Sequence, residues 1–134
     1  MTTTESNLVI EIRKQQAYLK SLFGEHVIVL TEVGDFYQAY GQDAMVLSRI
    51  TNYKLSKRDG SMRDSLQMCG FPSERGGLDT VLEKILEEGY VIGLLNQENS
   101  VDDRGRTVIT RKLENILTQG TYFESKNPTT LFIQ

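Results

Sequence analysis

The chain has 134 residues, of which 39% are hydrophobic and 25% are charged, and these values are typical of one globular domain. Its 15 basic and 18 acidic side chains give a formal net charge of -3, which excludes the uniformly basic surface of a nucleic-acid coat protein. The single cysteine and the single histidine, Cys69 and His26, exclude an intrachain disulfide and a Cys/His zinc site.

The first half of the chain predicts a helix, two strands and a second helix. Apolar residues recur at helical spacing over residues 8–23, and Gly24 is placed to end that helix. Residues 27–33 are β-branched and almost continuously apolar, as in a buried strand. A turn at 34–35 then separates this strand from a second one at 36–40, and residues 44–50 predict a short helix.

The second half predicts more strands and one well-defined helix. The predicted elements are a strand at 53–58, a strand at 66–72, a helix at 78–89, a strand at 90–95, a polar connection at 96–105 and a strand at 106–117. Together the elements predict an α/β fold of the α+β type. We expect a mixed sheet of five or six strands surrounded by about three helices.

Eight of the 15 basic residues fall into two short windows of the sequence. If the two windows converge in space, they form a local basic patch that binds backbone phosphates on an otherwise acidic molecule. Charges interspersed over a solvated surface are the alternative interpretation. The basic residues are Lys54, Lys57, Arg58 and Arg63 in one window, and Arg104, Arg106, Arg111 and Lys112 in the other.

The segment Gly34-Asp35-Phe36-Tyr37-Gln38 carries the most specific signal. In a strand that follows the turn, Phe36 and Gln38 point to one face and Tyr37 to the other. An exposed aromatic ring wedges between stacked base pairs from the minor groove, and an amide two residues later reaches the same base. The alternative is that Phe36 belongs to the core and Gln38 is an ordinary surface residue.

This segment resembles the N-terminal mismatch-recognition domain, domain I, of the MutS DNA mismatch repair family. Gly34-Asp-Phe-Tyr follows an apolar strand and precedes a helix opened by Asp43-Ala44, as in that family. The resemblance continues in order over residues 17–121, through Leu55-Ser-Lys-Arg58, Met68-Cys-Gly-Phe-Pro72, the helix at 78–89 and Gly120-Thr121. It implies a mixed sheet surrounded by helices, in which Phe36 inserts next to a mispaired or unpaired base.

The resemblance also implies roles for several basic residues. Lys57 and Arg58 match a family position near the DNA backbone. Arg106, Arg111 and Lys112 lie in a basic strand region of the family and are possible backbone contacts. Bending by a wedge selects a lesion because a mismatched step loses less stacking and pairing than a sound one when it is kinked.

One residue departs from the family pattern. The bacterial mismatch readers of the family have Phe-x-Glu, whereas this chain has Phe36-Tyr37-Gln38. An ionised carboxylate only accepts hydrogen bonds and is repelled by phosphates, whereas an amide both donates and accepts without charge. We therefore expect Gln38 to raise affinity for ordinary duplex and to lower the preference for a mismatch.

The resulting prediction is a DNA-binding domain at residues 1–121, followed by a tail or the start of a connector at 122–134. No catalytic residue, metal or cofactor is expected here, since ATP and Mg²⁺ belong to the remaining domains of a MutS-like ATPase. The expected partners are mismatched or distorted duplex DNA, those remaining domains, and a second subunit in a dimer. No membrane segment is expected, and the predicted location is the cytoplasm, at the nucleoid.

Two other functions remain open on the sequence. One is a MutS-like domain without mismatch specificity, acting on branched DNA, in recombination or for a mobile element, which Gln38 favours. The other is a protein-interaction module in which Phe36 anchors an interface. Exposure of Phe36 beside Lys57 and Arg58 would favour DNA binding, and a buried Phe36 would argue against it.

Overall fold

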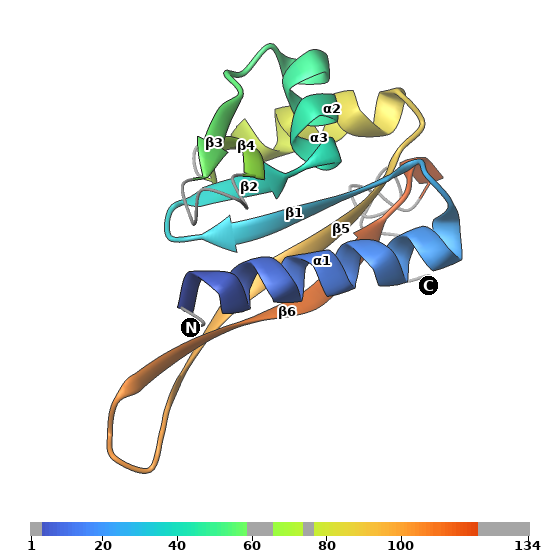
Figure 1. Ribbon diagram of the computed structural model, residues 1–134. Coiled ribbons are helices and arrows are strands. Elements are labelled where there is room, and N and C mark those ends of the chain that lie inside the picture. Colours follow the sequence, from blue (N-terminus) through green and yellow to red (C-terminus); the bar gives the residue numbers. More distant parts are fainter. Residues whose placement is uncertain (1–3, 59–65, 74–76, 121–134) are drawn as a thin grey trace.

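The computed structural model describes residues 4–58, 66–73 and 77–120, which form one sheet with helices on both faces (Figure 1). This part of the chain contains three helices and six strands, so the predicted α+β class is confirmed. In chain order the elements are α1 (Thr4–Phe23), β1 (Val27–Val33), β2 (Phe36–Tyr40), α2 (Gln42–Thr51), β3 (Ser56–Arg58), β4 (Leu66–Pro72), α3 (Gly77–Glu87), β5 (Val91–Val101) and β6 (Thr107–Leu117).

The strands lie in the order β3-β4-β2-β1-β5-β6. Strands β1 and β5 run parallel, and all the other neighbouring pairs run antiparallel, so the sheet is mixed as predicted. Helices α2 and α3 cover one face of the sheet, and α1 covers the other (Figure 1). The β1–β2 hairpin therefore lies at the centre of the sheet.

Strand β1 is almost continuously apolar because both faces of its first part, Val27 to Leu30, are covered. Ile28 and Leu30 pack into the cluster under α2 and α3, and Val27 and Val29 pack against Leu19 of α1. A strand buried on both sides reads as a continuous hydrophobic run, which is why its bounds were predicted correctly.

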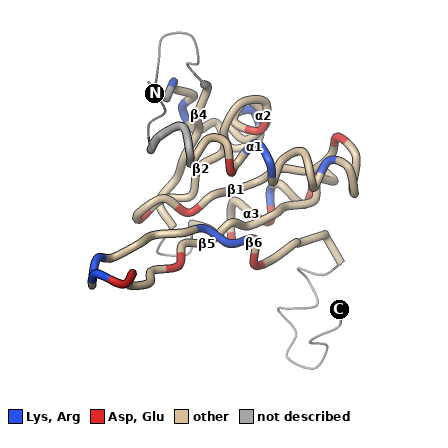
Figure 2. Tube along the Cα trace, turned by 60° about the horizontal axis from the view of Figure 1, so that its bottom comes forward, with Lys and Arg blue, Asp and Glu red and all other residues tan. Residues whose placement is uncertain are grey.

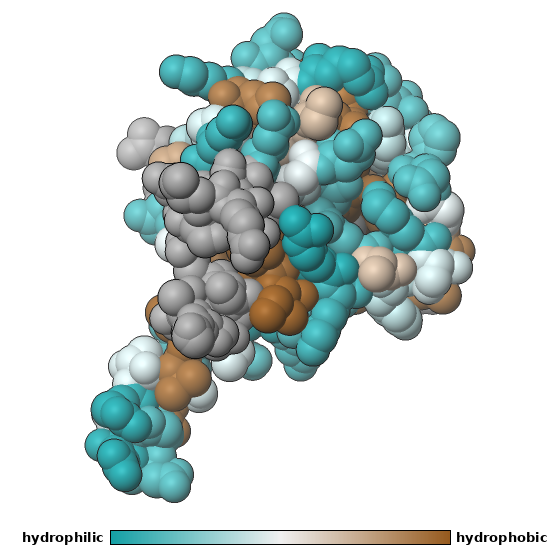
Figure 3. Space-filling model, in the orientation of Figure 1, coloured by the Kyte–Doolittle hydropathy of each residue, from teal (hydrophilic) through white to brown (hydrophobic). Residues whose placement is uncertain are grey.

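The β5–β6 hairpin is longer than the sequence predicted. Residues 96–105 were expected to be a polar connection, but β5 continues to Val101, and the chain reverses only between residues 102 and 106. That prediction was wrong because the outer half of the hairpin projects beyond the helices and is paired without burying a face (Figure 1). Apolar side chains on this part, Val101 and Ile109, are exposed, and the tip is hydrophilic (Figure 3).

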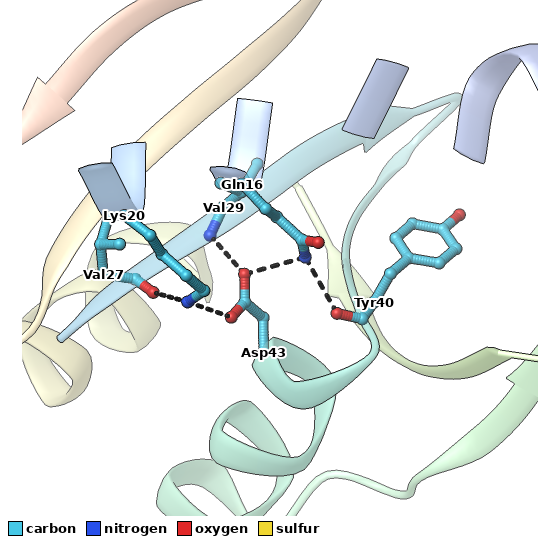
Figure 4. A network of polar contacts seen from close by, with 6 residues as sticks. All are labelled: Gln16, Lys20, Val27, Val29, Tyr40 and Asp43. Atoms are coloured by element: carbon cyan, nitrogen blue, oxygen red, sulfur yellow. Dashed lines mark hydrogen bonds and ion pairs between the residues drawn. The ribbon is translucent and has the colours of Figure 1, made fainter. Parts of the chain in front are cut away.

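A buried carboxylate joins three elements next to the β2–α2 connection (Figure 4). Asp43 of α2 is 2% exposed, and its Oδ2 accepts hydrogen bonds from the backbone N–H of Val29 at 3.0 Å and from Nε2 of Gln16 at 3.1 Å. Nζ of Lys20 lies 3.7 Å from the other oxygen, Oδ1. Because burial disfavours the charged form, the pKa of Asp43 is raised in spite of these partners.

Candidate nucleic-acid interface

Phe36 is presented at the turn of the central β1–β2 hairpin. Gly34 and Asp35 form the two-residue turn, and Val33 pairs with Phe36 across it. Gly34 has φ of 62°, the left-handed conformation that a type II′ hairpin turn requires at its first position. Phe36 is 45% exposed, so it is not a core residue.

The predicted alternation along β2 is confirmed. Tyr37 is buried on the face covered by α2 and α3, whereas Phe36 and Gln38 lie on the opposite face. Tyr37 stacks on Phe71 of β4 with ring centroids 6.1 Å apart, and its hydroxyl donates to Oδ1 of Asn96 at 2.7 Å. Burial, followed by the nearby Glu32 and Glu114 carboxylates, raises the pKa of Tyr37, which keeps the hydroxyl protonated as a donor.

The amide of Gln38 has a defined orientation. Its Oε1 accepts a hydrogen bond from the hydroxyl of Tyr40, two residues along the same face. Gly70 lies opposite on β4, where a Cβ atom would come within 3.1 Å of Cγ of Gln38. With Oε1 used inside the protein, the NH₂ group of Gln38 is the donor that this side chain offers to a ligand.

The turn before Phe36 is held by side chains on one side. Oε1 of Gln97 accepts from the N–H of Gly34 at 3.0 Å, and Nε2 of Gln97 donates to the carbonyl of Gly34 at 3.4 Å. Arg111 donates from Nε to the carbonyl of Glu32 at 2.9 Å and from Nη2 to Oε1 of Gln97 at 3.2 Å. These contacts connect β5 and β6 to the end of β1.

The turn is also held from the β4 side. The backbone N–H and the hydroxyl of Ser73 both donate to the carbonyl of Asp35, at 2.9 and 3.1 Å. Ser73, Gln97 and Glu32 carry no motif in the sequence that would have pointed to them as site residues. Gln97 could have been placed beside the turn only if the strand predicted at 90–95 had been expected to extend past Leu95.

Lys57 and Arg58 are not next to Phe36. Phe36 pairs with Pro72 of β4, whereas Lys57 of β3 pairs with Gln67, five residues further along β4. At about 3.4 Å per residue this separates Lys57 from Phe36 by roughly 17 Å along the strands. The odd offset also places exposed Lys57 on the opposite face from Phe36, and Arg58 is the last residue of β3.

The three basic residues in and before β6 occupy different environments. Arg111 is half-buried against the β1–β2 turn, and Lys112 is exposed beside Asn96 on the opposite face. Arg106 lies at the hairpin tip, where Nε is 3.1 Å from Oδ2 of Asp102. The N–H groups of Arg106 and Arg104 also donate to Asp102, and these hydrogen bonds lower the pKa of Asp102.

The two basic windows do not converge in the part of the chain that the structure describes. Strands β3 and β6 are the opposite edges of the sheet, and their basic segments lie on opposite sides of the molecule (Figure 2). The expectation of one shared patch was therefore wrong for these residues. Arg63 lies outside the described residues.

The described residues show no further chemical centre. Within 4–58, 66–73 and 77–120, no three His, Cys, Asp or Glu side chains gather as a group that would hold a metal ion. None of the described helices combines the length and the apolar character needed to cross a membrane. Cys69 is a buried free thiol, and burial raises its pKa.

Comparison with known proteins identifies a family for most of the chain. The family model described as MutS domain I matches residues 12–126. The chain is 35% identical over 95 residues to the DNA mismatch repair protein MutS of Thermodesulfovibrio yellowstonii, covering 71% of this chain and 11% of that protein. It is 31% identical over 124 residues to the MutS of Rickettsia prowazekii, covering 88% of this chain and 14% of that protein. The MutS of Salinibacter ruber is 30% identical over 99 residues, covering 74% of this chain and 11% of that protein.

Proposed function

Since the chain belongs to the MutS domain I family, we propose that it is a DNA-binding domain that recognises mispaired or distorted duplex in a mismatch repair protein. The proposal assigns no catalytic step to these residues, because the family match is to domain I alone. The chain spans only 11 to 14% of the relatives above. We therefore propose ATP and Mg²⁺ binding, dimer formation and the nucleoid location only for a longer MutS-like protein. The other domains of that protein would be partners of the DNA-binding domain at residues 1–121. Residues 122–134 would then be a tail or the start of a connector.

The observation that carries the proposal is an exposed Phe36 on a backbone held from both sides. A phenylalanine that is 45% exposed contributes little to the core, so burial does not explain its position. Phe36 follows the turn of the central hairpin; this turn is bonded to Ser73, just after β4, and to Gln97 of β5, and Arg111 of β6 is bonded to Glu32 at the end of β1. A rigid, protruding aromatic is suited to wedge into a base step and to stack on a base that is poorly paired.

Replacing Phe36 by alanine is expected to weaken binding to a G·T-containing duplex by about 1–3 kcal/mol, the value of an aromatic stacked on a base. The full-length protein would be titrated with matched and mismatched duplex at one salt concentration. The control is Phe23→Ala, which removes a 39% exposed ring at the end of α1, at the opposite end of β1, and leaves affinity unchanged. A loss below about 1 kcal/mol for Phe36→Ala would refute the wedge.

Mismatch specificity depends on residue 38, and Gln38 favours a second function: duplex binding without strong discrimination. The minor groove presents acceptor atoms at every base pair, so the NH₂ of Gln38, whose Oε1 is bonded to Tyr40, would find a partner at matched and mismatched steps alike. This would suit a protein that acts on branched DNA, in recombination or for a mobile element. The measured ratio of mismatch to homoduplex affinity decides between the two functions.

Gln38→Glu is expected to raise that ratio about fivefold, or about 1 kcal/mol, since a carboxylate lacks the donor and is repelled by phosphates. Tyr40 donates to a carboxylate oxygen as it does to Oε1, so the local geometry is kept. Gln42→Glu, at the exposed start of α2 and the other end of β2, controls for the added charge alone. An unchanged ratio in Gln38→Glu would contradict the proposed role of residue 38.

We also propose that basic residues of this domain contact the DNA backbone. Lys57 and Lys112 are exposed, and Arg58 follows Lys57 at the end of β3. Arg106 is already paired with Asp102, and Arg111 with the turn, so their guanidinium groups have partners within the protein. A protein-interaction surface is the other alternative, and the exposed Val101 and Ile109 on the projecting hairpin are the observation that favours it.

A further inference from the structure

The last two residues of β1 pair with β2 on one edge but no longer with β5 on the other. The parallel pairing of β1 with β5 stops at Thr31 and Leu95, next to the point where the pairing of β5 with β6 shifts register, between Leu94 and Leu95. The next carbonyl of β1, that of Glu32, accepts from Nε of Arg111 instead. The side chain of Glu32 in turn accepts from the backbone N–H of Gln97 at 2.8 Å. Side chains thus continue the pairing beyond the point where the ladder stops.

The amide of Gln97 acts on the turn as a neighbouring strand would. It accepts from the N–H of Gly34 and donates to the carbonyl of the same residue, so both polar backbone groups of Gly34 are matched. A guanidinium only donates hydrogen bonds, so its contact at 3.2 Å requires the oxygen of Gln97 to point at both Arg111 and Gly34. Arg111 therefore sets the orientation of the amide.

These contacts act on an exposed part of the chain. Gly34, Asp35 and Phe36 are all exposed, and the glycine has the freedom to change conformation easily. An unrestrained turn would lose conformational entropy on inserting an aromatic ring, and this loss would lower affinity. A turn that is held before DNA arrives has already lost that freedom.

We propose that Gln97 and Arg111 are positioning residues that fix the direction in which Phe36 enters DNA, an inference that rests on the proposed function. Neither residue needs to touch DNA in this role, because each acts through Gly34 or through the end of β1. Arg111 then supports Phe36 from within the protein, by orienting Gln97 and bonding the end of β1. Phosphate contact by Arg111 is the competing role, and the two are separable by experiment.

A double-mutant cycle between Gln97 and Phe36 tests the proposal in the full-length protein. We expect Gln97→Ala to weaken binding to a G·T duplex about fivefold when Phe36 is present, and less than about twofold in the Phe36→Ala background. Asn99→Ala, two residues along on exposed β5, is the matched control and changes neither value. Urea unfolding of each variant confirms that the folded protein is being measured.

The outcomes of the cycle distinguish failure of the positioning role of Gln97 from failure of the wedge role of Phe36. Equal losses for Gln97→Ala in both backgrounds, or no loss in either, would overturn the positioning role while leaving the wedge intact. No loss for Phe36→Ala alone would refute the wedge itself. Non-additive losses support the positioning role, because a residue that only stabilises the fold would lower binding regardless of Phe36.

Salt dependence separates positioning by Arg111 from phosphate binding. Lysine keeps the charge but lacks the planar fork that reaches the Glu32 carbonyl and Gln97 together, so we expect Arg111→Lys to weaken mismatch binding about as much as Gln97→Ala. The slope of log affinity against log salt should stay unchanged in Arg111→Ala. A phosphate contact would instead tolerate Arg111→Lys and reduce that slope by about 1 in Arg111→Ala, which would overturn the proposal.

Discussion

Asp43→Ala is expected to destabilise the protein by about 3 kcal/mol, because it leaves a buried backbone donor without its acceptor and removes the anionic partner of the partly buried Lys20, which keeps only the carbonyl of Val27. The N–H of Val29 lies in the buried part of β1 and donates to Asp43 at 3.0 Å. Lys20 is 28% exposed in its side chain, so water compensates part of its loss. Urea unfolding followed by circular dichroism gives the free energy of unfolding, and a loss below about 1 kcal/mol would contradict this account of the network.

Asp43→Asn is the matched control, since an amide oxygen still accepts from Val29 but carries no charge. Burial raises the pKa of Asp43, so the folded protein binds its proton more tightly than the unfolded chain, whose ordinary value is 3.8. This contribution to stability is present below pH 3.8 and is lost as pH rises through the raised pKa. The stability of Asp43→Asn relative to wild type should therefore increase from pH 4 upward. A difference that does not change with pH would show that the carboxyl titrates alike in both states.

Phe71→Ala is expected to lower the free energy of unfolding by about 3–5 kcal/mol, the usual range for deleting a buried phenylalanine. Phe71 is 1% exposed and lies between two aromatic rings, with centroids 6.1 Å from Tyr37 and 6.0 Å from Tyr53. Its loss leaves a cavity next to β2 and β4, and β2 begins with Phe36. The midpoint of urea unfolding should shift, and the same experiment on Phe36→Ala is the comparison.

Phe36→Ala, on the neighbouring strand β2, should affect DNA binding rather than stability. Phe36 is exposed, so Phe36→Ala should change stability by no more than about 0.5 kcal/mol while it weakens mismatch binding. A cost for Phe36→Ala similar to that for Phe71→Ala would show that Phe36 is packed in the folded protein. In that event its effect on DNA binding would no longer be specific to the wedge.

The central elements were predictable because burial leaves a pattern in the sequence. Strand β1 is covered on both faces and reads as an apolar run, and β4 was predicted with its exact bounds up to Pro72. Strand alternation, once the turn at Gly34 was recognised, predicted that Phe36 and Tyr37 lie on opposite faces of β2, but it left open which of the two is exposed. The family resemblance supplied the choice of which face is functional, and that choice does not follow from alternation.

The parts that were missed depend on contacts between distant segments. Residues 96 and 97 of β5 are polar and half-buried, and residues 98–101 are exposed on both faces, so this part of the strand has no hydrophobic periodicity to reveal it. The bonds of Gln97 and Arg111 to the β1–β2 turn join residues that are far apart in the chain. The strand order is likewise set by tertiary pairing, which composition does not encode. This order places the two basic windows at opposite edges of the sheet.

The position of β1 in the sheet bears on how the chain reaches its native state. One edge of β1 pairs with β2, which follows immediately, but the other pairs with β5, which is made only after β4 and α3. Until β5 docks, an apolar strand presents a row of unsatisfied backbone groups, the arrangement that templates aggregation. Folding therefore requires the pairing of β1 with β5, two strands far apart in the sequence, and we expect it to be slower than that of a helical domain of this size. Chains truncated before Val91 would keep that edge open, and we expect them to be recovered as aggregates.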